Sequence, residues 1–250
     1  MALTKVIGDG IGAVTGNVGI GEAAPANLLH VKVSDTGIAP HASAQIVLER
    51  EGTNYLQFLT AEAGTSGILF GDGSDIDVAS IKYDHNTKQM QFITETNTAM
   101  VIDGNGIITK PLQPAFMAIP ASIQTNLATG SYTTIAFGTE IFDLNSDFAS
   151  NTFTAPVTGK YQFNVHIVLL NVDSAHTLME MRLNASNRDV QISTSPDHDL
   201  VNDSGAQAYS LVTLMDMDAS DTAFFEIAMT GGTAQTDVHT QSVFSGYLVC

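Results

Sequence analysis

Residues 153–167 read Phe-Thr-Ala-Pro-Val-Thr-Gly-Lys-Tyr-Gln-Phe-Asn-Val-His-Ile, and this stretch decides the fold. From Tyr161 to Ile167 the odd-numbered positions are all apolar, and from Lys160 to His166 the even-numbered positions are all polar. A period of two predicts a β-strand with one buried face and one polar face. The stretch therefore predicts one strand of a sheet that covers a core.

Turn residues in the same stretch, and the pattern of the remaining chain, favour the same fold class. Pro156 has no N–H to donate to a ladder and ends one strand, while Gly159 permits the turn into the next. No stretch repeats apolar residues at the helical spacing of i, i+3, i+4 and i+7. Further strands are predicted over residues 45–49, 53–59, 67–70, 79–83, 89–94, 133–137, 152–155, 178–183, 209–217, 223–229 and 243–249. The sequence therefore predicts an all-β protein.

Composition limits the possible partners. The 250 residues carry 26 acidic and 9 basic side chains, which gives a formal net charge of −17. Phosphate binding needs a cationic surface, so we expect neither nucleic acid nor an anionic membrane surface as a partner. Cys250 is the only cysteine, which excludes an intrachain disulfide. No run approaches the ~18 apolar residues of a membrane-spanning helix, so no membrane insertion is expected.

A proline pair marks the predicted domain boundary. Pro111 and Pro114 interrupt any strand and stiffen a linker, which we place at residues 111–114. A β-rich region over residues 16–110 precedes this linker, and a second β-rich domain over residues 115–250 follows it. Residues 1–15 lack the long apolar core of a signal peptide, so synthesis in a cytoplasm is expected.

The second domain resembles the C1q/TNF-type jelly roll. The pattern F-x-A-P-x-x-G-x-Y-x-F over residues 153–163 and the closing Phe-Ser-Gly-Tyr-Leu at residues 244–248 carry this resemblance, together with the opening Ala-Phe-Met-Ala at residues 115–118. The resemblance implies a jelly-roll β-sandwich that forms a homotrimer. The residues that we predict to build its core are Phe153, Pro156, Gly159, Tyr161, Phe163, Phe244, Gly246 and Tyr247.

The first half resembles modules of phage tail fibres and virion fibres. Gly-Asn-Val-Gly-Ile-Gly at residues 16–21, then Pro25 and Leu-Leu-His-Val at residues 28–31, match the cassette common in such fibres. The resemblance implies a β-rich fibre shaft, intertwined or β-helical, over residues 16–110. It also implies that residues 1–15 attach the chain to other virion proteins of the capsid, portal or tail, which locates the protein on the particle surface after synthesis in the host cytoplasm.

Two late strands predict self-association. Residues 211–217 and 223–229 are apolar on both faces, whereas one face of a strand in a two-layered sandwich is expected to be polar. A second burial surface around an axis would cover the extra apolar face. The residues predicted to form this trimer interface are Leu211, Thr213, Met215, Met217, Phe224 and Phe225.

Two acidic turns are candidate ligand sites. Asp72, Asp75 and Asp77 supply oxygen ligands of the kind that calcium prefers, although a solvated acidic turn is the favoured interpretation and no other cofactor is expected. The long polar segment over residues 193–206 predicts an exposed loop. Its polar residues, which we predict to bind a receptor, are Asp197, His198, Asp199, Asn202 and Asp203.

No catalytic motif is present. The chain has no G-x-S-x-G elbow, no H-E-x-x-H and no phosphate-binding loop, so we predict that it is not an enzyme. The favoured function is a trimeric virion fibre or spike whose distal knob can bind a host-surface glycan or protein receptor. The alternatives are a capsid-decorating head fibre, a glycan-degrading tailspike with a carboxylate pair in a groove, and a secreted bacterial adhesin.

Overall fold

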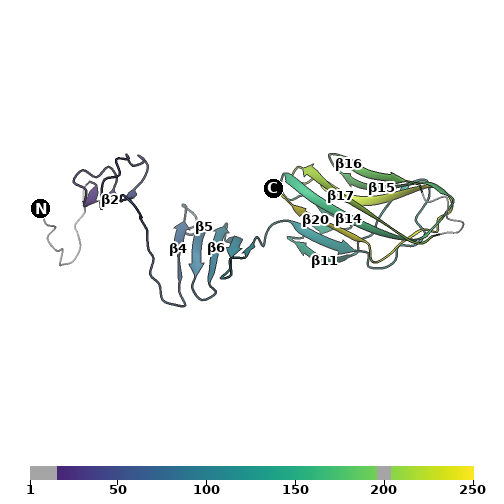
Figure 1. Cartoon of the computed structure of the whole chain (residues 1–250), viewed down its shortest axis with the longest axis horizontal. Helices are drawn as coiled ribbons and strands as arrows, with labels where there is room; N and C mark the ends of the chain where they lie inside the picture. Colours follow the sequence, from purple (N-terminus) through teal and green to yellow (C-terminus); the bar gives the residue numbers. More distant parts are fainter. Residues whose placement is uncertain (1–15, 196–203) are drawn as a thin grey trace. The chain divides into compact units, whose positions relative to one another are not determined.

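The computed structural model describes residues 16–195 and 204–250 and shows β-strands and no helix in those residues (Figure 1). The all-β prediction is thus confirmed. No part of the described chain forms a helix that could cross a membrane. The chain divides into two compact units, Met1–Ala61 and Glu62–Cys250. Each is described below on its own.

The first unit contains one three-stranded parallel sheet in the order β1-β2-β3. Its strands are β1 (Val18–Ile20), β2 (Leu29–Lys32) and β3 (Ile46–Glu49). The loop before β2 is fixed by the buried Asn27, whose Nδ2 donates to the carbonyl oxygen of Ala44 at 2.5 Å. Gly21, at φ +75°, lies against the Lys32 carbonyl, where a Cβ would clash. The cassette over residues 16–31 therefore forms the first two strands of this sheet.

The predicted strand over residues 53–59 is wrong. The structure places no strand between β3 and β4 (Thr65–Phe70), and Tyr55 and Leu59 are each 84 % exposed. An alternating pattern gives the faces of a strand but does not supply a neighbouring strand to bond with.

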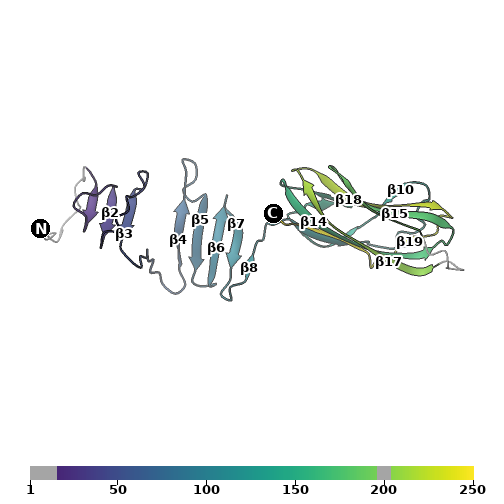
Figure 2. The same ribbon diagram turned by 45° about the horizontal axis from the view of Figure 1, so that its top comes forward.

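The second unit begins with a single-layered, five-stranded antiparallel sheet in the order β4-β5-β6-β7-β8 (Figure 2). The predicted strands over residues 79–83 and 89–94 are confirmed and form a hairpin, in which Asp84 accepts hydrogen bonds from the Asn86 and Thr87 amides and closes the turn. The remaining strands that join β4 in this sheet are β5 (Ala79–Asp84), β6 (Gln89–Thr94), β7 (Asn97–Ile102) and β8 (Ile108–Thr109).

A two-layered jelly roll follows, built from two six-stranded sheets. One layer has the order β12-β13-β18-β15-β16, with β10 also paired to β18. Its strands are β10 (Tyr132–Thr134), β12 (Phe148–Ala149), β13 (Thr152–Thr154), β15 (His176–Ala185), β16 (Asp189–Thr194) and β18 (Thr222–Gly231).

The other layer has the order β11-β9-β20-β14-β17, with β19 also paired to β14. Its strands are β9 (Ala115–Ile119), β11 (Thr139–Leu144), β14 (Gly159–Val172), β17 (Ser204–Met217), β19 (Asp237–Val238) and β20 (Val243–Leu248). Strand β14 contains the alternating run quoted from the sequence and lies between β17 and β20.

Aromatic rings fill the space between the two layers. Phe153, Tyr161, Phe163 and Phe244 have at most traces of exposed surface, and the ring centroids of Phe153 and Phe163 lie 5.6 Å apart. Gly246 leaves room for these rings, because a Cβ at this position would lie 2.6 Å from the Phe163 ring. The period-two pattern of β14 therefore gave the correct facing of its side chains.

Three residues predicted for the core lie elsewhere. Tyr247 is 46 % exposed, because alternation along β20 turns it outward when Phe244 and Gly246 point inward. Pro156 is exposed in the turn before β14, and Gly159 is half-buried at the start of that strand. The family-like motif thus mixes core residues with turn residues that only shape the backbone.

Candidate functional site

The outward face of the β11-β9-β20-β14-β17 layer carries two rows of uncharged side chains. The pairing register places Phe142, Met117, Ser245, Asn164 and Val212 in one row, and Leu144, Ala115, Tyr247, Gln162 and Leu214 in the next. Val212 is 65 % exposed and Leu214 is 59 % exposed. The adjoining row on this face is the charged pair Lys160 and Asp216. Uncharged rows bordered by charged residues are typical of an interface core with a polar rim. We call these two rows the outer face.

The trimer-interface prediction for β17 chose the wrong side of the strand. Leu211, Met215 and Met217 are buried in the sandwich core, and Thr213 lies half-buried on the same side. Because side chains alternate along a strand, Val212 and Leu214 point outward instead. The strand does have two apolar faces, but its solvent side contains the even-numbered residues.

The second apolar face inferred for β18 is covered by the same chain. Phe225 is buried in the core and Phe224 is half-buried. Glu226 lies on the opposite side of β18 from Phe225 and is buried beneath Arg182, whose Nε donates to the Glu226 carboxylate at 2.6 Å. The Arg182 guanidinium in turn lies 3.8 Å over the Tyr132 ring, so this face needs no second chain.

One end of the jelly roll is held by a buried polar cluster. Asp173 accepts hydrogen bonds from the Ala175 amide at 2.8 Å and from the Thr233 amide at 2.7 Å, and these donors hold the pKa of its carboxyl below the usual value. The buried His176 contacts the Gly231 carbonyl oxygen through Nδ1 at 2.9 Å and the Thr236 Oγ1 through Nε2 at 3.1 Å. The cluster therefore ties the turn before β15 to the loop after β18.

The strands that flank the predicted receptor loop reach the same end of the domain. Asp197, His198, Asp199, Asn202 and Asp203 lie outside the described residues. The flanking strands β16 and β17 are described: Thr194 in β16 pairs with Met179, and Ser204 in β17 pairs with Val172. The end of β16 and the start of β17 therefore both lie beside the Asp173 cluster. This end of the domain is opposite to the end at which β9 begins with Ala115.

Comparison with known proteins identifies this domain. The C1q domain family matches residues 115–249, which is more than half of the chain. The chain belongs to the C1q family. No match is found among curated proteins.

Solved structures with similar coordinates include the globular domain of zebrafish complement 1qA protein, at 20 % identity and a TM-score of 0.40, which covers 55 % of this chain and 98 % of that one. Murine APRIL at pH 5.0 matches at 8 % identity and a TM-score of 0.39, and covers 55 % of this chain and 99 % of that chain.

Domains of the C1q type commonly form homotrimers and bind ligands, and no enzymatic family matches the chain. The C1q domain of this protein offers two surfaces for these two roles. The uncharged outer face is suited to association. The turns around Asp173, at one end of the domain, are held by buried hydrogen bonds.

The acidic turn before β5 lies outside the C1q domain and does not gather its carboxylates around one point. Asp72 accepts hydrogen bonds from the Ser74 amide, the Ser74 hydroxyl and the Asp75 amide, and these donors lower the pKa of its carboxyl. Asp75 accepts a hydrogen bond from the Asp77 amide at 3.1 Å. These contacts build a turn, and the three carboxylates are not among the potential metal clusters of the described chain.

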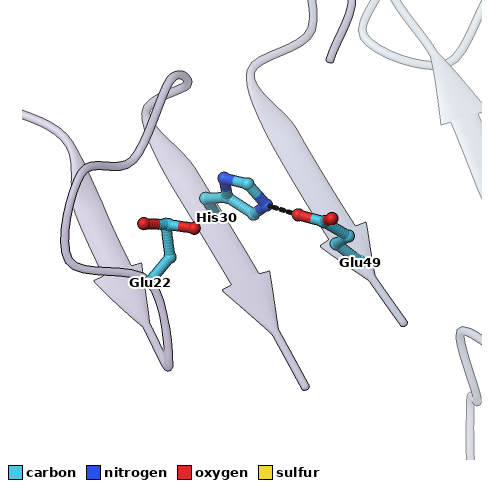
Figure 3. Close-up of side chains that lie close together, drawn as sticks. All are labelled: Glu22, His30 and Glu49. Carbon is cyan, nitrogen blue, oxygen red and sulfur yellow. Dashed lines mark hydrogen bonds and ion pairs between the residues drawn. The ribbon is translucent and has the colours of Figure 1, made fainter. Parts of the chain in front are cut away.

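A cluster that the sequence analysis did not predict lies in the β1-β2-β3 sheet. Glu22, His30 and Glu49 bring a nitrogen and two carboxylate oxygens within 4.8 Å of one another (Figure 3). The Nε2 of His30 lies 2.8 Å from Oε2 of Glu49, and both residues are buried. Three groups of this kind can bind a metal ion.

A lysine ammonium already lies among these carboxylates. Nζ of Lys32 is 2.9 Å from Oε2 of Glu22, 3.4 Å from Oδ2 of Asp35 and 3.6 Å from Oε2 of Glu49. The hydrogen bond to Glu22 raises the pKa of Lys32 and lowers that of Glu22. A metal ion would have to displace this ammonium, so the cluster is better explained as an ion network that joins the three strands.

The sequence contains a signal for this network. In the strand Leu29–Lys32, the polar residues His30 and Lys32 alternate with apolar ones, so they share a face, and Glu49 ends the next strand.

Proposed function

We propose that this protein is a non-enzymatic, homotrimeric fibre protein of a virus particle, in which the C1q domain is the distal knob that binds a host-surface glycan. The observation that carries the proposal is the outer face of the β11-β9-β20-β14-β17 layer. It crosses five strands with no charged side chain, and Val212 and Leu214 stay largely exposed in the single chain.

Association through this face supports the trimer on energetic grounds. Burying apolar surface contributes about 25 cal/mol per Å². No charge has to be desolvated in the two rows, so little of this gain is lost. The polar side chains of the rows, such as Gln162 and Asn164, can hydrogen-bond across an interface as interface polar groups usually do.

The end of the knob that carries the Asp173 cluster supports the binding role. Its turns are fixed by buried hydrogen bonds, which lowers the entropy lost when a ligand binds. The predicted loop adds three carboxylates, an imidazole and an amide, groups that hydrogen-bond sugar hydroxyls. The particle location rests on the resemblance of residues 16–31 to virion-fibre cassettes.

A pair of matched variants tests the trimer. Leu214→Asp places a carboxylate in the outer face, whereas Ile123→Asp makes the same change at an exposed side chain in the loop before β10. Light scattering of the purified full chain should show that Leu214→Asp lowers the mass toward one chain and that Ile123→Asp keeps the assembly. If the two variants have equal masses, the outer face is not part of the interface.

A second pair tests the binding role. Particles that carry Asp197→Asn, Asp199→Asn and Asp203→Asn together should adsorb to host cells more weakly than wild type. Asp72→Asn, Asp75→Asn and Asp77→Asn remove the same charge elsewhere and should leave adsorption unchanged. If the first triple variant adsorbs normally and melts normally, the loop is not the receptor site and a capsid-decorating role is favoured.

A further inference from the structure

The five-stranded sheet β4–β8 has one uncharged, largely apolar face and one face that contains both charged and apolar residues. Directly paired residues of an antiparallel sheet share a face, so the register assigns each side chain. The apolar residues of one face are Ile68, Phe70, Ile81, Tyr83, Met90, Phe92, Met100, Ile102 and Ile108. We call this set the inner face. It contains no charged side chain. The opposite face is mixed and carries Lys82, Asp84, Gln89 and Gln91 together with Leu69, Ile93 and Val101.

No second layer covers the inner face within the described residues of its own unit, 62–195 and 204–250. None of its nine apolar side chains is buried; Phe70 is 50 % exposed and Ile108 is 58 % exposed. An antiparallel sheet normally places its apolar face on a core and its polar face in water. A contiguous exposed apolar surface of this size marks an interaction site.

The β1-β2-β3 sheet repeats this arrangement in the separate first unit. Val18, Leu29 and Ile46 share one face with Ile20, Val31 and Leu48, and none of these six is buried. The charged network around Lys32 lies on the opposite face. Two sheets of the N-terminal half thus each have one uncovered apolar face.

The short linker between the β4–β8 sheet and the C1q domain favours other copies of this chain as the partner of the inner face. Only Lys110, Pro111 and Leu112 separate β8 from Gln113, whose Nε2 donates to the Leu248 carbonyl oxygen of the C1q domain at 2.6 Å. Three residues span at most about 11 Å. In a trimer of C1q domains, three copies of the sheet are therefore tethered near one another at an effective concentration of about millimolar or above.

The dimensions of the sheet fit a threefold arrangement. Five strands about 4.8 Å apart form a face about 24 Å wide, and the four strands of six residues, β4–β7, make it about 20 Å high, while β8 has two residues. Three such faces placed as the sides of a triangle leave about 7 Å from each central strand to the axis, against about 5 Å from a sheet to the midplane of an ordinary sandwich. The central strand β6 carries Met90 and Phe92, long side chains that can fill this extra depth.

We propose that the inner face of β4–β8 packs against the inner faces of two further copies of this chain and forms a closed three-sided prism. This inference rests on the proposed homotrimer. It replaces the intertwined or β-helical shaft with three separate sheets that share one apolar interior. Polar residues such as Lys82 and Gln91 then lie on the outside of the prism.

Photo-cross-linking in the full chain tests the prism. A diazirine amino acid about the size of methionine is placed at Met90 on the inner face or, as the matched control, at Gln91 on the opposite face of the same strand. Irradiation should join chains at position 90 several-fold more efficiently than at position 91, with two-chain and three-chain bands on a denaturing gel. Hydrogen exchange should also show that Phe92→Lys, but not Gln91→Lys, strips protection from β4–β8.

The outcomes separate this inference from the proposed homotrimer. A trimeric mass without cross-links at position 90, or with equal cross-links at 91, would overturn the prism and leave the knob trimer standing. A monomeric mass for the full chain would overturn the homotrimer itself. A two-chain mass with cross-links at 90 would mean that two inner faces pack as a sandwich, which contradicts the threefold prism.

Discussion

The C1q domain and the β4–β8 sheet are both antiparallel, and their strands alternate in the same way, yet only one of them has a core. Phe163 in β14 has no exposed surface, whereas Phe92 in β6 is half-buried and Phe70 in β4 is half-exposed. The difference is the second layer: the C1q domain folds two sheets onto each other, whereas no other sheet of the described part of the second unit covers β4–β8. A period-two pattern therefore predicts a face to be buried but does not say which chain buries it.

The largest effect is expected when the two regions are produced as separate fragments. Residues 112–250 should fold and form trimers alone, because the aromatic core lies entirely within them. Residues 1–111 should lose cooperative unfolding, because their sheets bury almost no apolar side chain. Circular dichroism during heating measures the unfolding of both fragments. If residues 1–111 alone melt at the temperature of the whole chain, their sheets do not depend on the C1q domain, which contradicts the prediction.

Within the knob, the two faces of β14 should differ strongly. Phe163→Ala should reduce the free energy of unfolding by about 3–5 kcal/mol, the usual loss for a buried phenylalanine. Gln162→Ala, on the outer face of the same strand, should cost under about 1 kcal/mol in the isolated chain. Denaturant titration gives both values, and equal losses would mean that the assigned facing is wrong.

The Asp173 cluster should contribute less. Asp173→Asn removes the charge that accepts three hydrogen bonds from Thr233 and Ala175, so a loss of about 1.5–3 kcal/mol is expected at pH 7. Its lowered pKa means that this stabilisation is present above pH 4 and is lost as the pH falls through the folded-state pKa. Wild type and variant should therefore converge in acid, which denaturation at several pH values can check.

The ion network of the β1-β2-β3 sheet should give a local effect with two pH limits. The lowered pKa values of Glu22, Asp35 and Glu49 place the loss of stability in acid, below their ordinary values. The raised pKa of Lys32 places a second loss at high pH, beyond its ordinary value of 10.5. The protection factors of the β1–β3 amides in the full chain, which are corrected for the intrinsic pH dependence of exchange, should be highest between these limits, and Lys32→Met should abolish this maximum. Protection factors that do not change with pH in wild type would contradict the network.

The smallest effect is a gain in stability. Oδ2 of Asp147 is buried without a hydrogen-bond partner, and burial followed by the nearby Asp143 charge raises the pKa of Asp147. Such a carboxyl costs stability as the pH rises through its folded-state pKa. Asp147→Asn should therefore raise the melting temperature of the knob slightly at pH 7 and leave it unchanged near pH 3. A lower melting temperature at pH 7 would show that the Asp147 carboxylate stabilises the fold, which contradicts this assignment.

The sequence was sufficient for the strands that bury their own side chains. The alternation of residues 160–167 gave the facing of β14, and the motif around Pro156 indicated the C1q fold that the family match shows. Both depend on local pattern, because period and turn chemistry are properties of neighbouring residues.

The predictions that failed depend on which surfaces meet in space. Met215 and Met217 were assigned to the interface and are buried in the core, while Val212 and Leu214 lie outside. On a strand that is apolar on both faces, alternation alone cannot tell the inward side. The Lys32 network was missed for a related reason: its carboxylates come from three separate segments of the chain.

The central claim is that one chain is incomplete and that three chains supply the missing layers. Light scattering of the purified full chain at micromolar concentration tests this most directly. The account predicts a mass near three times the 26.4 kDa of one chain. A stable, soluble species of 26.4 kDa would contradict it, because the outer face and the inner face would then both remain in water.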